Sequence, residues 1–393
     1  MEVQVPFAAQ AQFFFFAQQM EDLDDKYRQI VLSAKDIALL NPNTRTCPIF
    51  RSKRDAELTK GVYRRVRVLI DENRREGGNP WGVKFVTMFH QTNDAALFHS
   101  ASKLKKMGLA LQGNRWQKGK RTFLPLYEAK MVQAYDHRAA SVVIRAGNWV
   151  RQGQTEETSL VDHQNPEFVA QPRWWVADKE ADKILGDNPQ AAYLCYKDVT
   201  SATNQRTMIA AFIPHVGVVN SAPLLLKSDD ISYRRYCCLL ANLNSLALDF
   251  VARQKVGGVH LNFFIVNQLP LFPPDVYDGR CPWNKKQPLE KWIADRVLAL
   301  SCTANDMKPL AEATGFDPPV RKWNPAQRQQ LLAELDAAFF LLYDFKRADV
   351  EYILSTFRGR PEEILTPGMS VPAPTILQVY DQLLEEVKAV KSN

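Results

Sequence analysis

The sequence Glu128-Ala129-Lys130, which follows the apolar stretch 123–127, has a spacing that could support phosphodiester cleavage. Metal-dependent nucleases bring two carboxylates together on a divalent cation and keep a lysine near the attacked phosphate. Asp94 is a conceivable second carboxylate upstream. A match of three residues is expected by chance in a chain of 393 residues, so a lysine that contacts DNA or pairs with an acid is the simpler interpretation. A metal-dependent DNA nuclease that uses Glu128 and Lys130 is therefore kept as an alternative.

Candidate metal ligands are few in this sequence. His90, Asp94 and His99 lie close together, but their spacing does not bring them to one side of a helix or a strand. Asn93-Asp94 fits better as the cap of a short helix over 95–97. The six cysteines include no CxxC pair, which argues against a zinc ribbon. We therefore assign no metal site, and we expect reduced, mostly buried thiols in a cytoplasmic protein.

The sequence contains three of the four residues of a tetrapeptide that is typical of adenine methyltransferases. Adenine methyltransferases hold a flipped adenine with the sequence Asn/Asp-Pro-Pro-aromatic, whose ring stacks on the base. The nearest match is Asp317-Pro318-Pro319-Val320, in which an aliphatic residue replaces that ring. Gly257-Gly258 precedes a predicted strand rather than a helix, so it does not form a phosphate-binding loop. We expect a turn between helices at 317–320 and assign no catalytic residue to this chain.

Positive charge is concentrated in the first part of the chain. Residues 1–150 contain 24 Lys and Arg against 14 Asp and Glu, whereas the remainder contains 26 against 29. The net charge of +7 therefore comes entirely from the first part. Lys and Arg are dense at 100–125, and basic loops at 51–54, 60–67 and 115–121 add side chains of the kind that bind phosphates. This distribution favours a polyanionic partner, although a merely soluble basic protein explains the charge alone equally well.

Apolar and aromatic residues allow more than one interpretation. The run 5–18, with Phe13-Phe14-Phe15-Phe16, is broken by glutamines and is too short to span a bilayer. We predict a buried strand or helix there, with a surface that packs on another protein, and no membrane association. Four tryptophans could stack on splayed bases, although core positions are the more common use of this residue. They are Trp116, Trp149, Trp174 and Trp175.

The pattern of apolar residues predicts a mixed α/β (α+β) fold with a helical C-terminal part. Strands are expected at 66–70, 82–89, 123–127, 192–196, 207–213 and 261–266. Helices are expected at 51–61, 232–253, 349–357 and 375–390, and a further helix should begin at Asn324-Pro325. The polar, weakly patterned segment 145–172 is predicted to be a surface insertion.

Several long stretches resemble, in the same order, one region of a known family. They are Leu40–Ile70, Asn79–Phe98, Leu124–Arg138, Pro172–Ala177, Asp198–Pro223, Ala241–Pro274 and Leu331–Phe357. Together they are similar to the region that follows the catalytic core in large adenine-specific (N6) DNA methyltransferases. This family includes type IIG restriction–modification enzymes and the methylases of BREX- and DISARM-type phage defence. The resemblance covers nearly the whole chain but includes no methyltransferase core.

The resemblance implies a target-recognition module that binds double-stranded DNA for a separate adenine methyltransferase domain or subunit. S-adenosylmethionine would bind to that catalytic partner, and no cofactor is expected in this chain. We accordingly divide the chain into a connector that packs on the methyltransferase core (1–75), a target-recognition domain with a mixed sheet (76–280) and a helical C-terminal domain (281–393). Asn204 and its neighbours precede the apolar stretch 207–213, and Lys255 begins the segment that leads into 261–266.

Two sets of residues are assigned to DNA binding on this hypothesis. Those expected to contact phosphates are Arg51, Lys53, Arg54, Lys130 and Arg138. Those expected to contact bases or the backbone are Thr203, Asn204, Arg206, Lys255 and Asn262. Besides the nuclease, a third hypothesis is a non-catalytic remnant that only binds a partner protein through the surface at Phe13–Phe16.

Overall fold

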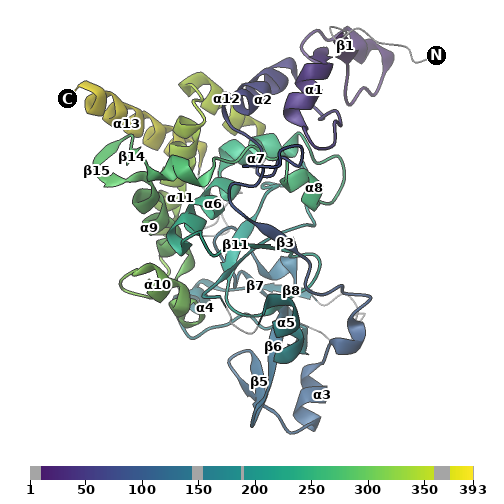
Figure 1. Ribbon diagram of the computed structural model, residues 1–393, viewed down its shortest axis with the longest axis vertical. Coiled ribbons are helices and arrows are strands. Elements are labelled where there is room, and N and C mark those ends of the chain that lie inside the picture. Colours follow the sequence, from purple (N-terminus) through teal and green to yellow (C-terminus); the bar gives the residue numbers. More distant parts are fainter. Residues whose placement is uncertain (1–9, 144–153, 187–189, 358–371, 393) are drawn as a thin grey trace.

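The protein is an elongated α/β molecule with most of its helices in the upper half of Figure 1 and its two larger sheets in the middle and at the lower end. The computed structural model describes residues 10–143, 154–186, 190–357 and 372–392. The mixed α/β fold class predicted from the sequence is confirmed by the several antiparallel and mixed sheets and the many helices. None of the helices in the described part of the chain has the length and apolar character needed to cross a membrane.

A four-stranded antiparallel sheet forms the middle of the molecule. Its strands, in spatial order, are β11 (Ala210–Ile213), β10 (Tyr193–Tyr196), β13 (Leu224–Leu226) and β3 (Lys84–Val86). All residues of β10 and β11 are buried, which explains why these strands could be recognised as short continuous apolar runs. Helix α6 (Tyr233–Asn244) packs on β11.

The helical segment predicted at 232–253 is two helices, α6 and α7 (Leu246–Arg253), because Ser245 interrupts it. Ser245 is in an extended conformation with φ −69° and ψ 142°. Its Oγ accepts a hydrogen bond from the amide of Leu248 at 3.3 Å and donates one to the carbonyl of Asn242 at 2.9 Å. A buried serine therefore ends one helix and caps the next.

A second sheet occupies the lower end of the molecule. Its order is β12 (Gly217–Val218), β6 (Arg121–Tyr127), β5 (Arg115–Lys118) and β4 (Ala110–Gln112), and β9 (Trp174–Ala177) also pairs with β6. Helix α5 (Asp178–Leu185) packs on β6 and β9. Helix α3 (Ala101–Lys106) precedes β4 and lies beside this sheet (Figure 1).

The N-terminal part forms a small unit at the upper end of Figure 1. It contains β1 (Gln10–Phe13), which pairs antiparallel with β2 (Ile30–Ser33), and the helices α1 (Ala34–Leu40) and α2 (Lys53–Arg65). Serines cap both helices, because Ser33 accepts from the amide of Asp36 and Ser52 accepts from the amide of Asp55, each at 3.1 Å. The first part of the predicted segment 5–18, up to residue 9, lies outside the described residues.

The C-terminal part is helical, as predicted. It contains the hairpin β14 (Arg280–Cys281) and β15 (Asn284–Pro288), followed by α9 (Leu289–Ser301), α10 (Lys308–Thr314), α11 (Pro325–Leu342), α12 (Arg347–Thr356) and α13 (Ala373–Ser392). The Oδ1 of Asn324 accepts a hydrogen bond from the amide of Gln327 at 3.1 Å, so the predicted cap of α11 is confirmed. Residues 317–320 form the turn before α11, also as predicted.

Two predicted strands have other structures. Residues 261–266 contain a short helix, α8 (Phe263–Val266), which begins after Asn262, and 66–70 contributes only an isolated bridge between Val68 and Pro270. Within the segment 145–172, residues up to 153 lie outside the described part, and the rest contains β8 (Gln154–Glu157) and α4 (Leu160–Gln164). Strand β8 pairs with β7 (Ala140–Val143).

One large hydrophobic cluster joins all three segments into which we divided the chain. It includes Ile30 from the N-terminal part, Leu194 from the middle sheet and Phe339 from α11, each at most 1% exposed. A second cluster lies between the two larger sheets, with Leu126 of β6 and Leu224 of β13 among its members. The lower sheet and α3 enclose a third, small cluster that contains Trp116 and Trp175.

Candidate nucleic-acid interface

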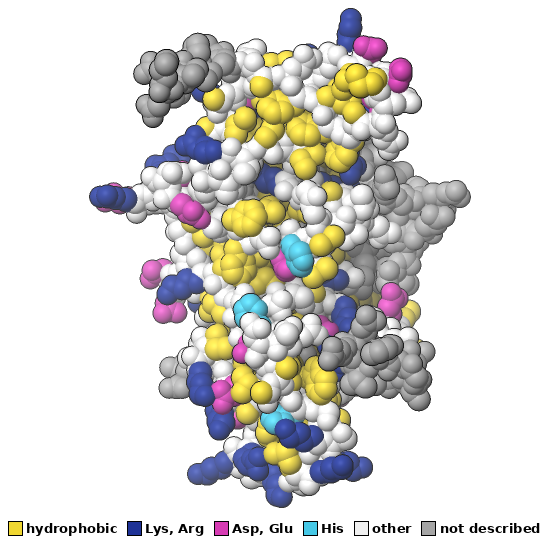
Figure 2. Space-filling model, turned by 90° about the vertical axis from the view of Figure 1, so that its right-hand side faces the viewer, with side chains coloured by type: hydrophobic (Ala, Val, Ile, Leu, Met, Phe, Trp, Pro, Cys, Tyr) yellow, Lys and Arg dark blue, Asp and Glu magenta, His cyan; other side chains and the backbone are white. Residues whose placement is uncertain are grey.

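The lower end of the molecule carries a group of exposed cations, which we call the cationic tip. Its members are Lys103, Lys105 and Lys106 of α3, and Lys118, Lys120 and Arg121 at the β5–β6 turn. Figure 2 shows Lys and Arg side chains gathered at this end. Two glycines form turns of the tip, because Gly108 has φ +78° and Gly119 has φ +58°, a left-handed conformation that glycine adopts without strain.

The tip contains cations and no acid in its stretch of the chain. Residues 95–127 contain seven Lys and Arg and no Asp or Glu. Across the described part of the chain, no carboxylate forms an ion pair with the six cations of the tip. The pKa of His99 is lowered by its burial and then by the charges of Lys103 and Arg121, which is the effect expected of a concentrated positive charge.

A second feature lies between the tip and the N-terminal unit, where two exposed loops are joined. We call residues 198–206 and 255–264 the paired loops. The amide of Thr200 donates to the carbonyl of Val259 at 3.0 Å, and the amide of Leu261 donates to the carbonyl of Asp198 at 2.7 Å. The imidazole Nδ1 of His260, which is half exposed, lies 2.7 Å from the carboxylate of Asp198. These contacts hold the two loops in one fixed arrangement.

Several predicted DNA-binding residues lie at or near the paired loops. Thr203, Asn204 and Asn262 are exposed there. Arg51 is also exposed, and its guanidinium donates to the carbonyl of Ala202 at 3.3 Å, so the start of α2 is beside the loop 198–206. Lys53 is exposed as well, at the first position of α2.

Two predicted arginines, Arg54 and Arg206, contact other protein groups at the edges of this surface. Arg54 donates to the carbonyl of Ala348 at 2.9 Å and stacks on the ring of Tyr352, 4.1 Å from its centroid. Arg206 donates to the carbonyl of Asn244 at 2.7 Å and pairs with Asp336 at 3.3 Å, with a side chain only 17% exposed. Both arginines therefore hold helices in place, and Arg206 has little surface left for a base.

Lys255 also has an internal role. Its ammonium donates to the carbonyl of Leu40 at 2.5 Å and to the side chain of Asn41, and it lies over the ring of Tyr63. Leu40 is the last residue of α1, so Lys255 caps the C-terminal end of that helix. Burial lowers the pKa of Lys255 well below its usual value. Sequence reasoning assigned this charge to DNA, whereas the structure uses it inside the protein.

Arg138 is completely buried, which corrects its assignment to a phosphate contact. Its guanidinium donates four hydrogen bonds to backbone carbonyls, at 2.8 Å to Asn165, 3.0 Å to Phe168, 2.7 Å to His163 and 2.8 Å to Thr303. A buried side chain with these partners is not accessible to DNA. Its role is to join the segment around α4 to the start of the C-terminal helices.

Glu128 and Asp94, the carboxylates of the nuclease alternative, contact other protein groups and do not converge on a common site. The carboxylate of Glu128 lies 3.3 Å from the ammonium of Lys130 and 3.4 Å from Nε of Arg173, so two cations neutralise it. The carboxylate of Asp94 instead accepts from the amide of His90 at 2.7 Å. The described residues contain no group of three or more His, Cys, Asp and Glu side chains positioned to hold a metal ion.

Sequence comparison identifies no related family for this chain. A scan of the chain against models of protein families finds no match, and no curated protein matches it. The function of the cationic tip and of the paired loops therefore has to follow from their own residues.

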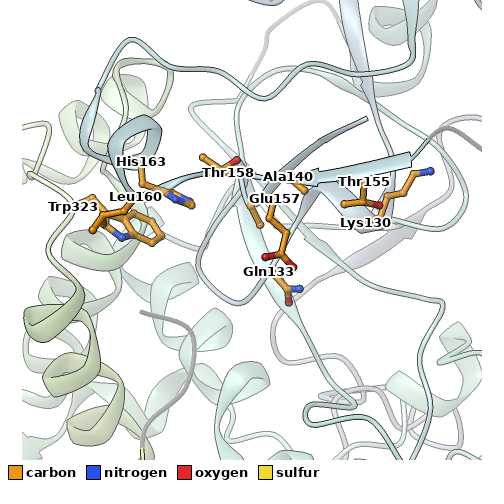
Figure 3. Close-up of a pocket in the computed structure, with 10 residues that line it drawn as sticks. Lys130, Gln133, Ala140, Thr155, Glu157, Thr158, Leu160, His163 and Trp323 are labelled. Atoms are coloured by element: carbon orange, nitrogen blue, oxygen red, sulfur yellow. The ribbon is translucent and has the colours of Figure 1, made fainter. Parts of the chain in front are cut away.

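A small pocket lined by polar and aromatic side chains lies beside Lys130. It has a volume of about 100 Å³, room for about three water molecules, and lies under the β7–β8 hairpin. In Figure 3 the rings of His163 and Trp323 lie against each other on one side, and Gln133 and Glu157 lie on the other. The two rings are stacked with centroids 3.9 Å apart.

Asp136 lies behind this pocket, and its carboxylate is 3.0 Å from Nε2 of His163. Burial alone would raise the pKa of Asp136, but the hydrogen bond and charge of His163 and the charge of Arg328 outweigh it and lower the pKa to about 2. The carboxylate therefore stabilises the fold above its unfolded pKa of 3.8, and this stabilisation is lost as the pH falls through about 2.

We expect Asp136→Asn to lower the free energy of unfolding at pH 7 by about 2 kcal/mol, since each pKa unit corresponds to about 1.4 kcal/mol. The same substitution should also flatten the loss of stability between pH 4 and pH 2. Urea unfolding at both ends of this range measures the effect. Asp275→Asn, at an exposed position, is the matched control and should change neither quantity. Equal acid sensitivity of the Asp136→Asn variant and the unmodified protein would contradict this account.

Proposed function

We propose that this chain is the DNA sequence-recognition module of an adenine-N6 DNA methyltransferase system in the cytoplasm. The observation that carries the proposal is the cationic tip, with six exposed cations and no described carboxylate paired to them. Exposed lysines without acidic partners favour phosphates, because neutralising a phosphate releases bound counterions. In this proposal the tip holds the duplex, and the catalytic site and S-adenosylmethionine belong to another domain or subunit.

The shape of the tip supports a duplex rather than a small anion. Strand β4 is the edge strand of the lower sheet, β5 lies between β4 and β6, and the turn at Gly119 joins β5 to β6. The six cations come from helix α3 and from this turn, so the tip offers several separate contacts to the phosphates of one duplex. Gln112 of β4 and Gln117 of β5 add amides of the kind that read base edges, and both are at least partly exposed.

The opposite end of the molecule supports the second part of the proposal, a protein partner. Large apolar side chains are exposed there within a short stretch, among them Phe16 at 60%, Met20 at 76% and Tyr27 at 83%. Clusters of exposed apolar residues of this kind mark protein–protein contacts. This N-terminal surface fits the expected docking of the catalytic polypeptide, at the far end from the tip (Figure 1).

The proposal is tested by selection and by salt dependence. The purified chain should bind a 30-bp duplex of random sequence, and the logarithm of the binding constant should fall linearly with the logarithm of the salt concentration. Repeated selection from a random duplex library should then enrich one sequence motif. Binding that does not depend on salt, or a selected pool without any enriched motif, would contradict the proposal.

A further inference from the structure

A hollow opens beside the paired loops, between them and the loop that follows α1. It has a volume of about 190 Å³, and its walls include Gly257, Phe264, Cys47, Pro48 and Gln254. An apolar cavity of about 150 Å³ accepts benzene, so this hollow has room for a single planar ring system. It is larger than the pocket beside Lys130, and one aromatic ring stands in its wall.

The aromatic ring is that of Phe264, the second residue of α8, which is 53% exposed. Burying such a ring normally stabilises a protein, so its exposure needs another explanation. The neighbouring Val259, on the same loop, is 61% exposed. Both residues extend from a backbone that the contacts between the paired loops hold in place.

Gly257 lines the hollow, and its neighbour Gly258 leaves the adjoining backbone uncovered. A Cβ atom at Gly258 would meet no heavy atom within 4 Å, and its φ is outside the left-handed region. The fold itself therefore does not require glycine at this position. Without a side chain at this position, another molecule has room to approach the backbone closely.

The surroundings of the hollow indicate the kind of ligand. Arg51 and Lys53 are exposed near the loop 198–206, which carries the exposed hydroxyl of Thr203 and amide of Asn204. The loop 198–206 contacts the loop that carries Phe264, so exposed cations lie on one side of the molecule with an aromatic ring in the wall of the hollow. These groups match the parts of a nucleotide, since phosphates bind cations and bases stack on aromatic side chains.

We propose that the hollow takes one unstacked base of a nucleic-acid strand, which stacks on Phe264 while the strand passes along the backbone of Gly257-Gly258. This inference rests on the proposed function, because it needs nucleic acid to be the ligand. It adds a contact for a single base at the middle of the molecule, away from the tip. Stacking does not depend on the identity of the base, so the hollow holds an extruded base rather than reading sequence.

Cys47 provides a direct readout because it lies in the wall of the hollow. It is the one half-buried thiol among the six cysteines, and the other five are buried. Burial raises the pKa of the Cys47 thiol, so its alkylation by iodoacetamide is followed at mildly alkaline pH. The probe is a 30-bp duplex with one unpaired base at its centre, and the fully paired duplex of the same sequence is its control. Cys47→Ala gives the background rate.

We expect the duplex with the unpaired base to slow alkylation of Cys47 about fivefold or more at saturation, and the fully paired duplex to slow it much less, since an unpaired base costs least to extrude. Gly258→Val and Phe264→Ala, at exposed positions, should keep the melting temperature and the salt dependence of binding but lose this protection. Fluorescence anisotropy measures binding of both duplexes in parallel.

The outcomes separate this inference from the proposed function. If the duplexes bind but the unpaired base does not protect Cys47, or if the two variants keep full protection, the hollow is not a base site and the proposed function stands. If neither duplex binds at any salt concentration, both proposals are wrong. Protection that is lost in both variants supports the base site.

Discussion

Replacing Arg138 by methionine is expected to lower the free energy of unfolding by about 4 kcal/mol or more. Methionine has a similar length but no donors, so the buried carbonyls of His163 and Thr303 and two partly buried carbonyls would lose their hydrogen bonds. Each buried polar group left without a partner costs about 1–3 kcal/mol. Urea unfolding followed by tryptophan fluorescence measures the loss.

Arg121→Met is the matched control for this experiment, because Arg121 is exposed and belongs to the cationic tip. It should change stability by no more than about 0.5 kcal/mol, the usual range for surface substitutions. It should also weaken DNA binding, which Arg138→Met should affect only through loss of the folded protein. An Arg138→Met protein with unchanged stability and weaker DNA binding would restore the phosphate role that the sequence suggested.

Arg138 also shows why single cations are hard to assign from a sequence. Its residue type favours a phosphate contact, but its acceptors lie 25 to 165 residues away along the chain. The same holds for Lys255, whose main acceptor is the carbonyl of Leu40, 215 residues earlier. Local sequence contains no information about such partners, so it cannot distinguish a buried cation from an exposed one.

Elements with local signals were predicted more successfully. The cap at Asn324 and the buried runs that became β10 and β11 are defined by neighbouring residues alone. Residues 261–266 were predicted as a strand because Phe263, Phe264 and Ile265 favour one, but Asn262 begins a short helix there. Tertiary packing decides such short apolar segments, whose periodicity fits either structure.

The candidate interface was predictable in composition but not in geometry. The high density of Lys and Arg at 100–125 is visible in the sequence, and the absence of any acid from 95–127 is the signal that could have identified Lys103, Lys105 and Lys106 as site residues. The contact between Thr200 and Val259, which joins the paired loops, links residues 59 positions apart and follows only from the fold. The paired loops are therefore formed by residues that are far apart in the sequence, and a local sequence pattern cannot predict them.

Neutralising the cationic tip is expected to reduce the affinity for a 30-bp duplex about 100-fold or more at moderate salt. The variant replaces all six cations, Lys103, Lys105, Lys106, Lys118, Lys120 and Arg121, by glutamine. Each cation that contacts a phosphate contributes about 0.9 to the slope of log K against log salt concentration, so the slope should fall by as much as about 5. Fluorescence anisotropy at several salt concentrations measures both quantities.

A pair of matched double variants distinguishes a local contact from a general effect of net charge. Lys118→Gln/Lys120→Gln removes two exposed lysines from the tip, and Lys285→Gln/Lys286→Gln removes two exposed lysines from β15, near the opposite end of the molecule (Figure 1). Both change the net charge equally. Because screening limits electrostatic effects to about 8–10 Å at physiological salt, only the tip variant should lower the slope, by about 2. Equal losses in the two variants would mean that DNA responds to total charge and that the tip is not its binding site.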